Sequence, residues 1–127
     1  MNPQQIASPR FRAVVENTFA ADAALDAGRF VGRLAPDATF QLGGQPPVTG
    51  REAIQTVVAE TFSAFKHVEH SLRAAYELPD VLVYEADVQY TFRDGRRLTV
   101  PYANVLGFSG EFVQSYRIYL DLSGIGT

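Results

Sequence analysis

The sequence predicts an α+β domain, with helices in the first half of the chain and an antiparallel sheet in the second. Apolar residues recur every three or four positions from Pro9 to Leu25, as in an amphipathic helix. Thr49 and Glu52 have the spacing of a capping box at the start of a later helix. The segment Val81–Asp121 divides at two glycine-containing turns into three strands. Helices that precede a run of hairpins indicate α+β.

Three helices and one short strand are expected in the first half of the chain. Residues 1–8 are expected to be flexible. The first helix buries one apolar stripe: Phe11, Val14, Val15, Phe19 and Ala23. Gly28 interrupts this pattern, and a short second helix ends at Pro36. Residues 38–42 are a strand candidate, and two glycines and two prolines make 43–47 a loop. The third helix has its own stripe: Ile54, Val57, Val58, Phe62 and Phe65.

Residues 68–76 alternate between apolar and polar side chains, which predicts a half-buried strand. His70 shares the apolar face of this strand and is expected to point inward. There it is either a core histidine satisfied by one hydrogen bond or a functional group. His67 has the opposite parity and is expected at the surface.

The register of the last three strands depends on the lengths of their two turns. With two-residue loops at Asp94-Gly95 and Ser109-Gly110, Asp87 lies opposite Tyr102, and Tyr102 lies opposite Arg117. The face that they share is then rich in polar side chains, and it is the predicted wall of a pocket. Its other polar members are Glu85, Gln89, Thr91, Asn104, Ser115, Tyr119 and Asp121.

The opposite face of these strands is apolar in this register, so the sheet needs two covers. The chain's own helices can supply one cover. A second subunit is the natural source of the other, which predicts a homodimer through the outer face of the sheet. A change of one residue in either loop would exchange the two faces across that turn.

Length and composition fit a single globular domain: 127 residues, 46% hydrophobic and 20% charged. A net charge of −3 gives no sign of a nucleic-acid partner. There is no cysteine, and two histidines are too few for a typical zinc site, so no metal is expected. The N-terminus lacks the pattern of a signal peptide, and no apolar run is long enough to span a membrane. We therefore expect a cytoplasmic protein without membrane contact.

Two segments resemble the nuclear transport factor 2-like superfamily, and most closely its SnoaL-like domains and ketosteroid isomerases. They are Asp37-Ala38-Thr39-Phe40 and the Pro-Pro-x-x-Gly-Arg-Glu pattern of residues 46–52. The closing segment, residues 116–121, is also similar to the last strand of SnoaL-like proteins. The resemblance covers nearly the whole chain and implies one SnoaL-like domain over residues 1–127. It further implies a cone-shaped, cystatin-like fold, in which a curved antiparallel sheet wraps three N-terminal helices around a deep pocket, commonly as a dimer.

The catalytic residues of these relatives transfer only in part. The base of ketosteroid isomerases would fall among residues 41–43, which are Gln, Leu and Gly and cannot accept a proton. Their oxyanion aspartate corresponds to Asn104, which donates a hydrogen bond but does not titrate. The Arg-x-Asp pair of limonene-epoxide hydrolases is replaced by Tyr102-Ala103-Asn104. SnoaL-like cyclases use an acid and a histidine, for which Asp121 and His70 are the candidates.

The leading hypothesis is an enzyme without a cofactor that acts on a small, largely apolar, oxygenated molecule. Isomerisation, cyclisation, dehydration and hydrolysis all require a proton acceptor and oxyanion donors. The predicted catalytic residues are Asp87, Asp121, Asn104, Tyr102 and His70. The predicted substrate-binding residues are Arg117, Tyr119, Gln89, Phe19, Phe40 and Phe62.

Two other classes remain open on the sequence alone. The same pocket could belong to a non-catalytic module that binds a small molecule, with Asp87 and Arg117 as a structural ion pair. Alternatively, the dimer or sheet surface could dock another protein. Asp121, close to the end of its strand, could also be simply solvated.

Overall fold

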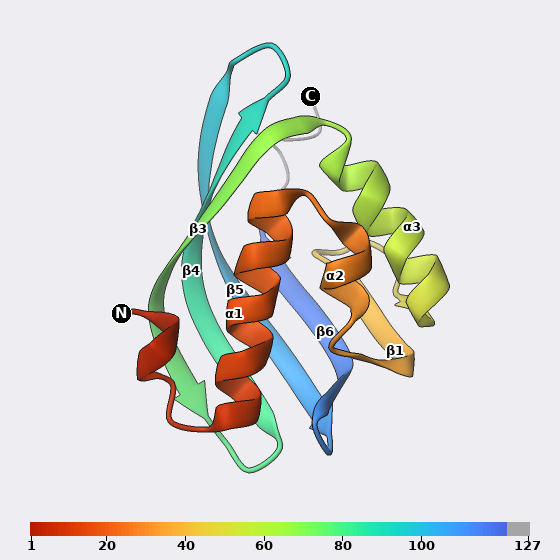
Figure 1. The fold of residues 1–127 in the computed structure, drawn as a ribbon, viewed down its shortest axis with the longest axis vertical. Coiled ribbons are helices and arrows are strands. Elements are labelled where there is room, and N and C mark those ends of the chain that lie inside the picture. Colours follow the sequence, from red (N-terminus) through yellow and green to blue (C-terminus); the bar gives the residue numbers. More distant parts are fainter. Residues whose placement is uncertain (122–127) are drawn as a thin grey trace.

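Three helices pack against the concave face of a six-stranded sheet in the computed structural model, which describes residues 1–121 (Figure 1). A short 3₁₀ turn (Pro3–Gln5) precedes the helices α1 (Pro9–Ala24), α2 (Ala27–Val31) and α3 (Arg51–Phe62). The strands are β1 (Leu34–Leu42), β2 (Val48–Thr49), β3 (Phe65–Glu77), β4 (Val81–Phe92), β5 (Arg97–Ser109) and β6 (Phe112–Leu120). Their order in the sheet is β2-β1-β6-β5-β4-β3. The predicted α+β class with three N-terminal helices is confirmed, and a parallel β1–β6 pair makes the sheet mixed.

The first half of the chain follows the sequence prediction except near two helix ends. Helix α1 stops at Leu25, which has a left-handed φ of 53°. Helix α2 ends before the predicted Pro36, because the chain is already in the sheet at Leu34. The capping box at Thr49 is wrong. Thr49 belongs to β2, where it pairs with Thr39 of β1. Gly50 becomes the N-cap of α3 without a side-chain hydrogen bond.

The hairpin between β4 and β5 has a longer loop than predicted. Phe92 N–H donates to the carbonyl of Arg96 at 2.8 Å, which leaves a loop of three residues, 93–95. Gly95 has a φ of 90°, as the last position of such loops requires. The extra residue shifts the pairing by one, so Tyr102 lies opposite Ala86 rather than opposite Asp87.

The hairpin between β5 and β6 also departs from the prediction, because its two-residue turn lies one residue further along the chain. Its turn is formed by Gly110 and Glu111, since Ser109 pairs with Phe112. An irregularity at Gly107 shifts the register once more, and Tyr102 lies opposite Leu120 instead of Arg117. The total shift is odd, so β6 presents the opposite set of side chains to the helices.

The predicted face is therefore right for β5 and wrong for β4 and β6. Even-numbered residues of β4 and β5 lie under the helices and join the core, as do those of β6 from Tyr116 onward. The buried ones among them are Leu82, Tyr84, Ala86, Val88, Phe92, Val100, Tyr102, Asn104, Leu106, Phe108 and Tyr116. Before the irregularity takes effect in β6, Val113 is buried and Phe112 is exposed. The β4 and β6 parts of the predicted apolar row are thus covered by the chain's own helices, whereas its β5 part lies on the outer face. Homodimerisation and a cytoplasmic location stay predictions.

No helix within residues 1–121 is both long and apolar enough to cross a membrane.

Candidate active site

A cavity of about 110 Å³ lies between the helices and the inner face of the sheet. Aromatic and aliphatic side chains form most of its wall. Eight residues with polar groups also line it: Thr18, Asp22, Thr61, His70, Tyr90, Tyr102, Asn104 and Tyr116. A cavity of about 150 Å³ is enough to bind benzene. The enclosed space therefore suits a ligand, or part of one, of roughly that size or smaller.

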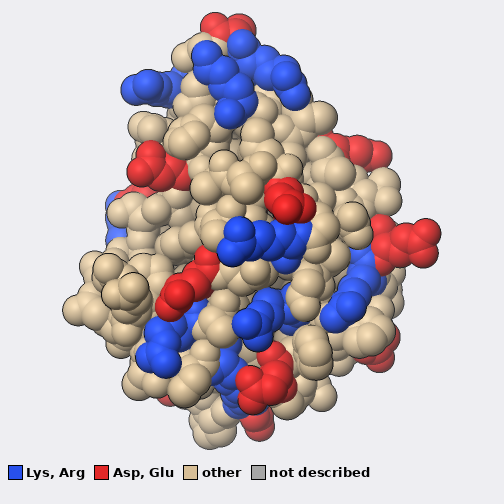
Figure 2. All heavy atoms as spheres, in the orientation of Figure 1, with Lys and Arg blue, Asp and Glu red and all other residues tan. Residues whose placement is uncertain are grey.

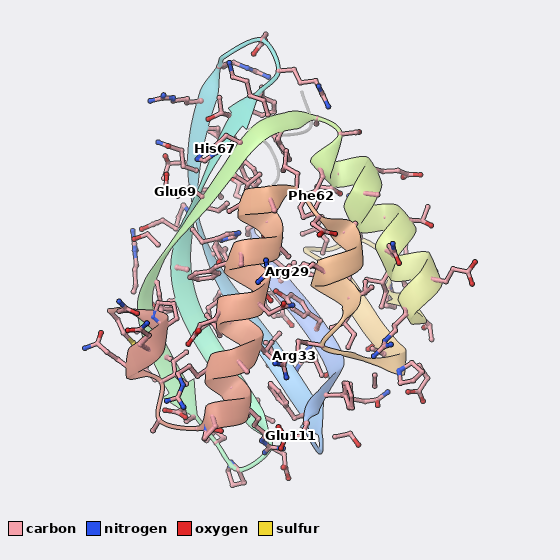
Figure 3. All side chains as sticks on the ribbon, in the orientation of Figure 1. Arg29, Arg33, Phe62, His67, Glu69 and Glu111 are labelled. Carbon is pink, nitrogen blue, oxygen red and sulfur yellow. The ribbon has the colours of Figure 1, made fainter. Side chains whose placement is uncertain are left out.

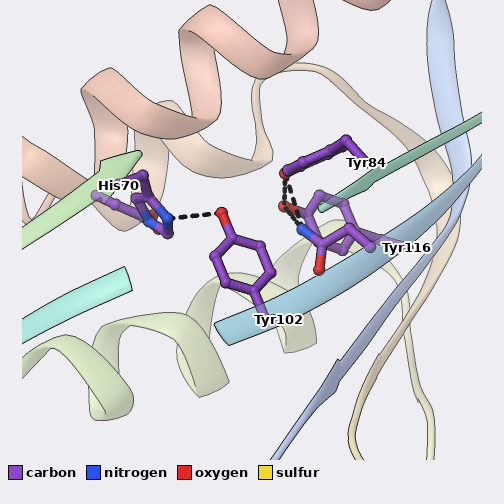
Figure 4. Close-up of polar contacts among 6 residues, drawn as sticks. His70, Tyr84, Tyr102 and Tyr116 are labelled. Atoms are coloured by element: carbon purple, nitrogen blue, oxygen red, sulfur yellow. Dashed lines mark hydrogen bonds and ion pairs between the residues drawn. The ribbon is translucent and has the colours of Figure 1, made fainter. Parts of the chain in front are cut away.

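Three of these polar side chains form a continuous hydrogen-bonded chain. The carboxylate Oδ2 of Asp22, on α1, lies 2.6 Å from Nε2 of His70, on β3. The other ring nitrogen, Nδ1, lies 2.7 Å from the hydroxyl of Tyr102, on β5 (Figure 4). The ring of Phe19 stacks on the imidazole with centroids 4.8 Å apart, which fixes the plane of the ring. We call these residues, Asp22, His70 and Tyr102, the relay.

The protons of the relay follow from the chemistry of its ends. Burial raises the pKa of Tyr102 far above the ordinary 10, and the nearby Tyr84 and Asp22 add to the effect. The phenol therefore keeps its proton and can donate it to Nδ1 of His70. The proton of a neutral imidazole then sits on Nε2 and is donated to Asp22. This is the order of groups by which a carboxylate orients a histidine that accepts a proton.

A second polar cluster lies deeper in the core and consists of Tyr84, Asn104 and Tyr116. The side-chain amide of Asn104 donates to both phenol oxygens, at 2.8 Å to Tyr84 and 3.2 Å to Tyr116 (Figure 4). Burial raises the pKa of Tyr84 to about 12 and that of Tyr116 well above 10. The two hydroxyls are 3.5 Å apart, so at most one can donate to the other. One phenol proton is left over, and of the two phenols Tyr116 is the one that lines the cavity.

The structure brings together about half of the residues predicted from the sequence. His70, Tyr102 and Asn104 line the cavity together with Phe40 and Phe62. Figure 3 shows Phe62 at the end of α3, where it reaches the cavity. Phe19 lies behind the imidazole as a support. His67, predicted at the surface, is exposed there and lies 3.6 Å from Glu69 (Figure 3).

The remaining predicted residues lie away from the cavity. The corrected register turns four of them to the outer face of the sheet: Asp87, Gln89, Arg117 and Tyr119. Asp121 follows the end of β6 and is exposed. Asp87 pairs with Arg73 at 2.7 Å rather than with Arg117. The predicted geometry for these residues is wrong because the first loop has three residues instead of two, and because the irregularity at Gly107 changes the register between β5 and β6.

Asp22, Tyr84 and Tyr116 were missed by the sequence prediction. Asp22 stands four residues after the buried Thr18, on the apolar stripe of the first helix. A carboxylate on such a stripe is rare without a partner, and this signal could have singled it out. The two tyrosines were assigned to the outer face by the same register error.

Replacement of Asp87 by asparagine is expected to leave ligand binding in the cavity unchanged. Its partner Arg73 is 58% exposed, and such ion pairs contribute about 0–1 kcal/mol to stability. The free energy of unfolding in urea should fall by no more than about 1 kcal/mol. A clear loss of ligand affinity, measured by calorimetry on the folded variant, would show that Asp87 belongs to the ligand-binding site.

Residues 1–121 contain no group of three or more His, Asp or Glu side chains placed to hold a metal ion.

Comparison with solved structures shows the same fold in other proteins, two of which were solved with small molecules. A hypothetical protein with a ketosteroid isomerase-like fold from Catenulispora acidiphila, solved with trimethylamine, is 25% identical over 88% of each chain, with a TM-score of 0.80. A putative SnoaL-like polyketide cyclase from Jannaschia sp. CCS1 is 17% identical, covers 95% of this chain and 94% of that chain, and has a TM-score of 0.80. TerC, co-crystallised with polyporic acid, is 14% identical over 92% of this chain and 95% of that chain, with a TM-score of 0.78.

No curated protein matches the sequence. A family match described as SnoaL-like domain covers residues 12–115, which is most of the chain and includes both polar clusters except Tyr116. The two segments that suggested this resemblance, residues 37–40 and 46–52, lie inside the match. The chain belongs to the SnoaL-like domain family.

Proposed function

We propose that this protein is an acid–base enzyme that works without a cofactor on a small oxygenated molecule held in the cavity. The observation that carries the proposal is the relay, whose two hydrogen bonds of 2.6 and 2.7 Å end at a phenol on the cavity wall. Apolar walls exclude water from the reacting group, and a positioned acid or base contributes about 10²–10⁴-fold to a rate. Asn104 and Tyr116 complete the proposed site.

The proposed reaction starts with the removal of a proton from a carbon next to a carbonyl group. The phenol oxygen of Tyr102 takes this proton while its own proton moves to Nδ1 of His70. An imidazolium forms beside the carboxylate of Asp22, and the substrate becomes an enolate. The buried site carries one negative charge before and after this step, so no net charge is created in an apolar environment.

Return of the proton completes the cycle. If the substrate has a conjugated double bond, the enolate is a dienolate, and delivery of the proton to its far carbon isomerises the substrate. Attack of the enolate carbon on a second carbonyl group would close a ring, and the returned proton would then neutralise the alkoxide that forms. The unused phenol proton of Tyr116 is the proposed donor to the enolate oxygen, and Asn104 holds that phenol in place from behind. A phenol that stays protonated at high pH is suited to this role.

Proton exchange tests the proposal without knowledge of the natural substrate. Cyclopentanone has six heavy atoms, like benzene, and its α protons exchange for deuterium when an enolate forms. We expect the protein to accelerate this exchange in D₂O, measured by ¹H NMR. Replacement of Tyr102 by phenylalanine should lower the catalysed rate by about 10²–10⁴-fold.

Tyr90→Phe is the matched control for this experiment. Tyr90 lines the same cavity, and its hydroxyl has no hydrogen bond within residues 1–121. Its loss should leave the catalysed rate within a few-fold of the parent. Equal rates for the parent and Tyr102→Phe, with both proteins folded, would rule out the relay as the acid–base group.

A second candidate is a non-catalytic module that binds a small amine. The cavity combines aromatic walls with the carboxylate of Asp22, whose Oδ1 has no hydrogen-bond partner among the described residues. These are the features that bind alkylammonium ions, and the Catenulispora acidiphila relative was solved with trimethylamine. Tert-butylammonium and tert-butanol have the same shape and differ in charge. Preferential binding of the cation, without any proton exchange, would favour the binding module.

A further inference from the structure

The cavity opens at one end of the molecule, where several strands and a helix finish. Leu42 is the last residue of β1, Leu120 is the last of β6, and Thr61 lies in the final turn of α3. All three line the cavity and are at least partly exposed. The β4–β5 hairpin forms the end of the molecule beside this opening (Figure 1).

The tip of this hairpin is strongly basic. Residues 93–97 contain three arginines and one aspartate, although the whole chain has a net charge of −3. Figure 2 shows positively charged side chains gathered at this end of the molecule. Within residues 1–121, none of these arginines has a carboxylate within salt-bridge distance.

Two of the arginines are held on the cavity side of the hairpin. Arg93 donates from Nε to the carbonyl of Ser63 at 2.6 Å, directly after the lining residue Phe62. The guanidinium of Arg96 lies 4.3 Å from the ring centre of Phe92. That ring packs on Phe65, which lines the cavity. Each arginine is therefore fixed by one contact and, among residues 1–121, keeps N–H groups without a hydrogen-bond partner.

We infer that Arg93 and Arg96 bind a carboxylate of the ligand at the mouth, while the ligand's carbonyl-bearing end enters the cavity. The inference rests on the proposed acid–base function, and it names the substrate class as small oxo-carboxylates. The arrangement keeps the anion outside, away from the buried carboxylate of Asp22, and leaves the apolar end for a cavity of about 110 Å³. Guanidinium groups suit this task because they can pair with a carboxylate through two parallel hydrogen bonds.

A pair of probes that differ only in charge tests this inference. Levulinate carries a methyl ketone at one end and a carboxylate at the other, and 4-oxopentanamide is its neutral counterpart. We expect the parent protein to bind levulinate more tightly by on the order of tenfold, measured as dissociation constants by ligand-observed NMR. The double variant Arg93→Gln, Arg96→Gln should bind both probes equally.

Arg97→Gln is the matched control, because it removes the same charge from the same hairpin. Arg97 has the strand parity of Thr99 and Pro101, on the outer face of the sheet, so its loss should leave most of the preference for levulinate. Unchanged affinity for 4-oxopentanamide shows that the double variant is folded, and Arg96→Lys should restore part of the preference relative to Arg96→Gln. Equal binding of the two probes by the parent, or a preference that survives in the double variant, overturns the inference.

The outcome is separable from that of the proposed function. Arginine-dependent binding of levulinate without exchange of its α protons would keep the mouth site and reject the relay. Relay-dependent exchange of cyclopentanone without any preference for levulinate would keep the relay and reject the mouth site.

Discussion

Replacement of Asp22 by asparagine is expected to lower catalysed proton exchange by about 10³–10⁴-fold while the protein stays folded. The carboxylate accepts the proton on Nε2 of His70 at 2.6 Å. An amide can donate at this position, which favours the other tautomer, with the proton on Nδ1. That proton would be donated to the oxygen of Tyr102, and the imidazole could no longer accept the phenol proton. The same substitution in the Ser-His-Asp triad lowers turnover by about 10⁴-fold for this reason.

Exchange of cyclopentanone measures this effect, and Glu16→Gln supplies the control. Glu16 lies on the same helix and is exposed, so its replacement removes a carboxylate without touching the cavity. The control should exchange at the parent rate. Parent-like exchange in Asp22→Asn would mean that the carboxylate does not set the tautomer of His70.

Alkaline pH is expected to remove several kcal/mol of stability through the buried tyrosines. In the unfolded chain these phenols ionise with a pKa near 10, whereas burial raises the pKa of Tyr84 and that of Tyr90 to about 12, and those of Tyr102 and Tyr116 above 10, in the folded protein. The folded state then holds more protons than the unfolded state. Stability is complete below pH 10 and falls as the pH rises above it, by about 1.4 kcal/mol for each such tyrosine at pH 11.

The free energy of unfolding in urea, measured at pH 9 and pH 11, tests this expectation. The four tyrosines together should lower it by about 5 kcal/mol between the two pH values. Tyr84→Phe should reduce this difference by about a quarter, whereas Tyr119→Phe, at a side chain that is 50% exposed, should not change it. Tyrosinate absorbance that rises in the native protein near pH 10 for all tyrosines would contradict the prediction.

The fold could be predicted from the sequence because periodicity within each element does not depend on its neighbours. His70 was assigned to the pocket by the parity of its own strand, and Asn104 by parity together with the family resemblance. Tyr102 was assigned as a member of the predicted polar face that it shares with Asn104, and all three line the cavity. The register between neighbouring strands, in contrast, depends on the length of the turn that joins them. Asp94-Gly95 suits either a two-residue loop or the end of a three-residue loop, since both place glycine at a positive φ. This ambiguity misplaced Asp87, whereas the irregularity at Gly107 misplaced Arg117.

The relay as a whole could not be predicted, because its members come from three elements that meet only in the folded chain. The sequence contains a histidine at position 70 and a tyrosine at position 102, but neither position indicates which acid approaches them. Asp22 reaches the imidazole because α1 packs across β3. The packing angle of a helix on a sheet is set by many side chains together, and no local pattern encodes it.

This arrangement makes the proposed acid–base activity sensitive to the position of α1 on the sheet. One end of the relay belongs to α1 and the other two members belong to the sheet. A small sliding of the helix would lengthen the 2.6 Å contact before any strand separates. Warming or mild denaturant should therefore abolish the proposed proton-exchange activity while the secondary structure is still intact.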